Sequence, residues 1–131
     1  MKHNEKTIEN LILCYLRDLG LEPWKNETVG RYNVKFKKFI PLTGEFKGVG
    51  SPDILAVLPG GRLLAIEVKS KGGKPTHHQT TFLDRINRFG GLALIARSVR
   101  DVSLALENIL PIALDNQELL RKYEFYEPKE E

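Results

Sequence analysis

Cysteine is almost missing from the 131-residue sequence, which contains Cys14 and no other. One cysteine excludes an internal disulfide framework and a zinc site built from clustered cysteines. Long hydrophobic runs are missing too, since the longest cover about five or six residues, whereas a transmembrane helix needs about 20. The first residues lead into an amphipathic segment and not into a secretory signal. These absences predict a protein with no membrane span in a reducing, cytoplasmic setting.

Charge is unevenly distributed, although the net charge is only +3. Residues 25–75 contain ten basic against four acidic residues, and the rest of the chain is net acidic. A basic middle segment favours an anionic partner such as nucleic acid, but a solvated basic surface has the same composition. Within it, Lys35, Lys37 and Lys38 alternate with aromatic residues, which predicts an exposed β-arm at about 29–47. This arm would contact either a DNA backbone or a second protomer.

Hydrophobic periodicity and turn residues predict an α/β order of elements in a single domain, 1–131. The helices are expected over 4–19, 76–88, 98–110 and 116–123, and the main strands over 53–58, 63–70 and 92–96. Asn4 is placed to cap the first helix, and Thr76 with Gln79 resembles a capping box for the second. A hairpin followed by a helical crossover predicts a mixed central sheet flanked by helices.

Three ionisable side chains are expected to converge at one end of the predicted hairpin. A four-residue turn at 59–62 sets Asp53 opposite Val68 and diagonal to both Glu67 and Lys69. Carboxylates in such an apolar strand are costly to bury unless they are paired or bind a metal. A salt bridge at the rim is the simpler structural alternative. Two carboxylates beside a lysine suit a hard cation such as Mg²⁺ and the hydrolysis of a phosphodiester.

The same residues carry a family resemblance. Gly50-Ser51-Pro52-Asp53 followed by Glu67-Val68-Lys69 resembles the Pro-Asp…Glu-x-Lys signature of the restriction-endonuclease-like nuclease superfamily. In its order of elements, the chain more closely resembles the small stand-alone form of the virus-type replication-repair nuclease (VRR-NUC) domain, from about residue 5 to 107. The resemblance implies an αβββαβ core, with a variable tail after about residue 111.

The resemblance also implies an activity, a DNA endonuclease that hydrolyses phosphodiester bonds with Mg²⁺ or Mn²⁺. Asp53 and Glu67 would hold the metal with the Val68 carbonyl, and Lys69 would position the attacking water. By analogy with compact resolvases, the substrate would be branched or junction DNA in replication, repair or recombination. The enzyme would be a homodimer in a bacterial cell or a phage-infected host.

Further residues have a role implied by the resemblance and an ordinary structural alternative. A glutamate of the first helix commonly adds a metal contact in the family, and Glu9 is favoured over Glu5 because it matches the family pattern better. Gln79 either contacts the site or only completes the capping box. Lys71 and Lys74 are placed to meet phosphate or are simply solvated. For the whole chain, the main alternative is a non-catalytic DNA-binding module that retains the nuclease fold.

Overall fold

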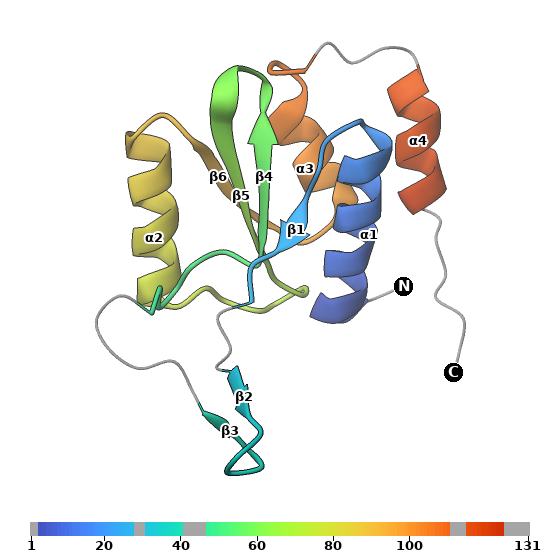
Figure 1. Ribbon diagram of the computed structural model, residues 1–131. Coiled ribbons are helices and arrows are strands. Elements are labelled where there is room, and N and C mark those ends of the chain that lie inside the picture. Colours follow the sequence, from blue (N-terminus) through green and yellow to red (C-terminus); the bar gives the residue numbers. More distant parts are fainter. Residues whose placement is uncertain (1–2, 28–30, 41–46, 111–114, 125–131) are drawn as a thin grey trace.

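The computed structural model describes residues 3–27, 31–40, 47–110 and 115–124 (Figure 1). It contains four helices, α1 (Glu5–Asp18), α2 (His77–Arg88), α3 (Val99–Leu106) and α4 (Asp115–Glu124). Its strands are β1 (Trp24–Lys25), β2 (Arg31–Asn33), β3 (Lys38–Ile40), β4 (Ile54–Leu58), β5 (Arg62–Val68) and β6 (Leu92–Ala96). A 3₁₀ turn, η1 (Pro59–Gly61), joins β4 to β5.

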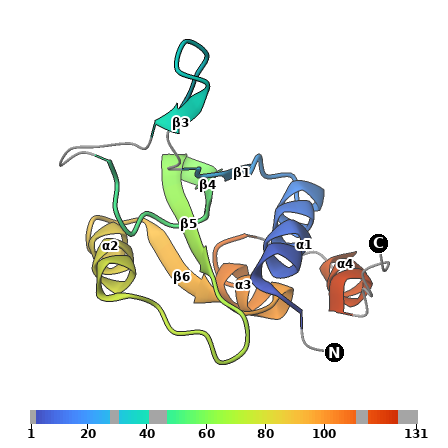
Figure 2. The same cartoon turned by 90° about the horizontal axis from the view of Figure 1, so that it is seen from below.

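The central sheet is mixed, with the strand order β1-β4-β5-β6. Strand β4 pairs antiparallel with both β1 and β5, whereas β5 and β6 are parallel and are connected through α2. Helix α2 lies on one side of the sheet, and α1, α3 and α4 lie on the other (Figure 2). The predicted α/β class, with a mixed sheet flanked by helices, is confirmed and is consistent with a restriction-endonuclease-like core.

The core has a larger and a smaller part because the two faces of the sheet are covered unequally. The larger cluster packs α1, α3 and α4 against one face, with Ile12, Tyr15 and Leu16 fully buried. The smaller cluster lies under α2 and includes Ala65, Leu83 and Ala93. Strand β5 is central, so its last five residues are all buried. A charged residue near the end of this strand is therefore carried into the interior.

Local capping signals place the helices as the sequence predicted. The Asn4 side chain accepts a hydrogen bond from the Thr7 N–H at 2.8 Å and caps α1. Thr76 caps α2 in a complete capping box with Gln79. Helix α3 ends at Leu106, so its predicted end at 110 was wrong. The Ile109 and Leu110 N–H groups both bond to the Leu106 carbonyl, and the chain turns there instead of continuing the helix.

The predicted pairing of β4 with β5 was wrong by one residue. Leu58 pairs with Arg62 across the three-residue turn η1, and Ile54 pairs with Ile66. Gly60 and Gly61 have φ values of +84° and +78°, a conformation that glycine adopts without strain, so the turn closes one residue earlier than expected. Continued by one position, this register sets Asp53 opposite Glu67 and not opposite Val68.

The basic segment forms a separate antiparallel pair, β2 and β3, which Figure 1 shows below the central sheet. Lys35, Lys37 and Lys38 are all exposed, and the Lys35 ammonium lies 5.7 Å from the centre of the Phe36 ring. Parts of the predicted 29–47 arm and of the predicted tail after 111 lie outside the described residues.

Candidate active site

The loop that carries Asp53 is fixed from the edge of the sheet by Asn26. The Asn26 N–H donates to the Asp53 carbonyl at 2.8 Å. Its side-chain amide donates to Ser51 Oγ at 2.9 Å and to the Pro52 carbonyl at 3.0 Å. Three bonds from one residue therefore position the backbone just before β4. Sequence reasoning did not find this role for Asn26, because the partners are more than 20 residues away along the chain.

Gly50 brings the same loop against the start of α2. Its φ is +81°, and a Cβ at this position would lie 2.5 Å from the carbonyl carbon of His78. No side chain fits there, because the neighbouring atoms are helix backbone. The glycine thus allows the Asp53 loop and the first turn of α2 to lie in direct contact, which brings Gln79 to the end of β5.

Glu67 is the central residue of the site. Only 2% of it is exposed. Its Oε1 accepts a hydrogen bond from Gln79 Nε2 at 2.9 Å and lies 3.7 Å from Lys69 Nζ. Its Oε2 is buried and has no hydrogen-bond partner among the residues that the structure describes. An unsatisfied buried carboxylate oxygen is costly, so this atom marks a position where a positive charge would be stabilised.

Gln79 completes the capping box of α2 and also contacts Glu67. Its Oε1 accepts from the Thr76 N–H at 2.8 Å, which completes the capping box. That bond orients the side chain so that the amide NH₂ points to Glu67. Sequence reasoning expected a contact with water or phosphate, and the direct hydrogen bond to the Glu67 carboxylate was missed.

Asp53 adds a second carboxylate beside Glu67. One Asp53 oxygen, Oδ2, accepts from the Val68 N–H at 2.8 Å, which orients the carboxylate across the strand end. Burial and the adjacent negative charge of Asp53 raise the pKa of Glu67 to about 8, and Lys69 only partly opposes this effect. The pair therefore resists carrying two negative charges, as expected of carboxylates that share a site.

The two glutamates of α1 lie at the border of the site with partners of their own. Glu9 forms an ion pair with Lys25 at 3.8 Å, and burial together with the charge of Asp53 raises the pKa of Glu9. Glu5 Oε1 accepts from the Ser70 N–H at 3.4 Å. The preference for Glu9 over Glu5 as a metal contact stays a prediction.

The donor set of the site fits a hard divalent cation. In the part of the chain that the structure describes, no three His, Cys, Asp or Glu side chains are grouped to hold a metal. Asp53 and Glu67 therefore form a pair, with the Val68 carbonyl as the predicted backbone ligand. Magnesium usually takes one or two protein carboxylates and completes its shell with water and substrate phosphate, so a pair is sufficient.

The exposed lysines of the next loop lie beyond this cluster. Lys71 and Lys74 follow β5, and both are exposed between Lys69 and the start of α2. Their contact with phosphate stays a prediction.

With this geometry described, the chain can be compared with known proteins. Residues 42–100 match the family model of the VRR-NUC domain. The match confirms the predicted resemblance over the segment that contains Asp53, Glu67, Lys69 and Gln79. Comparison with curated proteins and with solved structures gave no match.

A VRR-NUC domain implies a nuclease-type, DNA-processing function, with DNA as the substrate. The matched segment does not include α1 or most of the basic arm at 29–47. Among the described residues, no helix is long and apolar enough to cross a membrane.

Proposed function

We propose that this chain is a DNA endonuclease that hydrolyses phosphodiester bonds with Mg²⁺ or Mn²⁺. The observation that carries the proposal is the buried Glu67 Oε2, which has no hydrogen-bond partner within the described part of the chain and lies at the same strand end as Asp53. A carboxylate pair with a raised pKa binds a proton or a cation more readily than it stays doubly charged. Its place within the VRR-NUC match favours the cation.

Asp53 and Glu67 would hold the metal, with the Val68 carbonyl and Glu9 as further ligands. When bound, a divalent cation supplies Lewis-acid stabilisation of the negative charge that develops on the phosphate. Lys69, whose side chain is largely buried beside Glu67, would orient the attacking water and offset phosphate charge. Gln79 holds Glu67 Oε1 and so leaves Oε2 for the metal.

Branched or junction DNA and a homodimer are the finer parts of the proposal. The exposed lysines of the β2–β3 arm and of the loop after β5 support a DNA surface wider than one strand. A dimer would place two sites across a junction and give a 14.9 kDa chain enough surface to hold it. In this role the enzyme would act in replication, repair or recombination.

The test is a cleavage assay with Mg²⁺ and Mn²⁺ on a four-way junction, a flap, a nicked duplex, a plain duplex and a single strand. We expect Glu67→Gln and Lys69→Met to lose at least about 10³-fold in rate, because each removes a group that acts in the transition state. Glu118→Gln, on the exposed surface of α4, is the matched control and should cut like the wild type. Equal cleavage by all variants would refute the proposal.

A second readout does not depend on cleavage. A metal that binds only the folded chain raises its unfolding temperature, and the rise grows with the logarithm of the metal concentration divided by Kd. Mn²⁺ should therefore stabilise the wild type and Glu118→Gln, and the stabilisation should be lost in Asp53→Asn. DNA binding without metal stabilisation or cutting would identify a non-catalytic binding module instead.

A further inference from the structure

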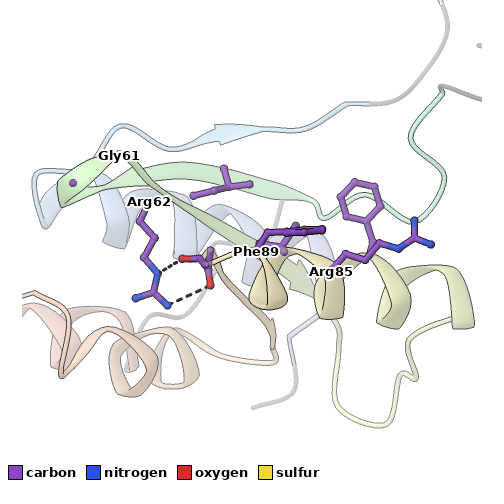
Figure 3. Close-up of a pocket in the computed structure, with 10 residues that line it drawn as sticks. Gly61, Arg62, Arg85 and Phe89 are labelled. Carbon is purple, nitrogen blue, oxygen red and sulfur yellow. Dashed lines mark hydrogen bonds between the residues drawn. The ribbon is translucent and has the colours of Figure 1, made fainter.

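A second concave site lies at the opposite end of α2 from Glu67. It is a pocket of about 720 Å³ between the end of α2 and the turn that joins β4 to β5. Its walls are Phe82, Arg85, Ile86 and Phe89 from the helix side, and Arg62 and Leu63 from the strand side. Figure 3 shows Arg62 at one end of the pocket and Arg85 at the other, with Phe89 between them. The volume falls within the range of small-molecule pockets.

The apolar wall of this pocket is covered at Ile86, which packs against the smaller core cluster, and is open at Phe89. Phe89 is 85% exposed, although a phenylalanine at the end of a helix would normally pack against its own domain. Phe82, Arg85 and Phe89 follow one another at three- and four-residue spacing, so they lie along one side of α2. An aromatic, a cation and a second aromatic in sequence form a surface on which nucleic acid bases stack.

The charged groups of the pocket are both positive. Arg62 Nε and Nη2 donate to the carbonyls of Gly90 and Gly91 at 2.7 and 3.3 Å, which holds the guanidinium in place. The Arg85 side chain has no hydrogen-bond or ion-pair partner among the residues that the structure describes. No carboxylate lines the pocket. Arg85 lies on the same side of α2 as Phe82 and Phe89, so its guanidinium complements the phosphate of a base that stacks there.

We propose that this pocket binds one unpaired nucleotide of the DNA strand that the catalytic site holds. The inference rests on the proposed nuclease function and adds a substrate feature to it. Helix α2 connects the two sites, and ten residues separate Gln79 from Phe89, a rise of about 15 Å. At 3.4 Å per nucleotide, that distance corresponds to about four nucleotides of a strand. The pocket selects DNA with a short unpaired segment next to a duplex.

The experiment measures metal-free binding in EDTA, so that no cleavage is needed. Duplexes carry single-stranded overhangs of 0, 2, 4, 6 and 8 nucleotides at either end. Wild-type affinity should rise about tenfold when one overhang reaches about four nucleotides, because stacking of one base contributes a factor of this size. Replacing the bases of that overhang with abasic sites should remove the gain.

The variants separate stacking from charge. Phe89→Ala should lose the tenfold gain and bind blunt duplex as the wild type does, and Arg85→Ala should lower the salt dependence of overhang binding by about one phosphate contact. The control is Leu104→Ala, which removes an exposed apolar side chain from α3. It should retain the gain.

Three results overturn the inference. The affinity gain survives in Phe89→Ala, it survives with abasic overhangs, or Phe89→Ala loses as much affinity for blunt duplex as for the overhang. If the affinity gain persists in Phe89→Ala, the pocket binds another partner, such as an acidic peptide. The outcomes are independent of cleavage. A wild-type overhang gain that Phe89→Ala loses, in a chain that never cuts, would refute the endonuclease and not the nucleotide pocket.

Discussion

The two ends of α2 differ in the kind of group that is left without a partner. At the N-terminal end, polar groups meet in the interior and nearly every one has a partner. Gln79 contacts both Thr76 and Glu67, and Glu67 Oε2 is the exception. At the C-terminal end, the apolar ring of Phe89 is exposed to solvent. In each case the unsatisfied group, a buried oxygen or an exposed ring, is the one that a ligand would satisfy.

The largest expected effect on stability concerns the polar end. The pKa of Glu67 is about 8 in the folded chain, against an ordinary value of 4.5. The folded state thus binds this proton more tightly than the unfolded state. The resulting stability is complete below about pH 4.5 and is lost as pH rises through about 8. The full difference is on the order of 5 kcal/mol.

Urea unfolding in EDTA at pH 5.5 and pH 8.5 checks this expectation. The wild type should lose more free energy of unfolding between the two values than Glu67→Gln, which has no proton to lose. Parallel curves for the two proteins would show that Glu67 stays ionised with a favourable partner, and would remove the contrast between the two ends of α2.

A smaller effect is expected from Gly50→Ala, which tests whether the Asp53 loop must touch α2. The new Cβ would lie 2.5 Å from the His78 carbonyl carbon at a φ of +81°. The backbone must shift, at a cost of about 3 kcal/mol. Thermal unfolding should show the loss, and Mn²⁺ stabilisation should weaken with it. Gly60→Ala has a similar positive φ but open space around it, so it should cost only about 1 kcal/mol and leave Mn²⁺ stabilisation unchanged.

The smallest effect is expected at the C-terminal end of α2, where Asn87 ties the helix to β6. Its side chain donates to the Ala93 carbonyl at 2.9 Å and accepts from the Ala93 N–H at 2.8 Å. Asn87→Ala should cost about 1–2 kcal/mol in urea unfolding, because two hydrogen bonds are lost. Its unfolding temperature should still rise with Mn²⁺ as much as that of the wild type. A smaller rise with Mn²⁺ in Asn87→Ala would mean that a change at the C-terminal end of α2 alters metal binding at its N-terminal end.

The sequence predicted those parts of the fold that depend on neighbouring residues. The Asn4 cap, the capping box of α2 and the strand at 92–96 were all found correctly, because each follows from periodicity or from a pair three residues apart. The register of β4 with β5 was wrong, since the glycines of the turn permit both three and four residues. Local patterns do not decide between these lengths.

The candidate site shows the same division. Asp53, Glu67 and Lys69 were identified from their types and spacing, and the structure brings all three to one end of the sheet. The supports of the site were missed, namely Asn26 under the Asp53 loop and Gly50 against His78. These contacts join residues about 25 or more positions apart, and no pattern along the chain records them.

The bond between Gln79 and Thr76 has a kinetic consequence. The Gln79 amide accepts from the Thr76 N–H and donates to Glu67, so we expect opening of the first turn of α2 to release the carboxylate as well. Each opening leaves Glu67 without the hydrogen bond that orients its carboxylate. The exchange rate of the Thr76 amide hydrogen with solvent therefore reports, without substrate, the fraction of time for which Gln79 keeps its hydrogen bond to the Glu67 carboxylate.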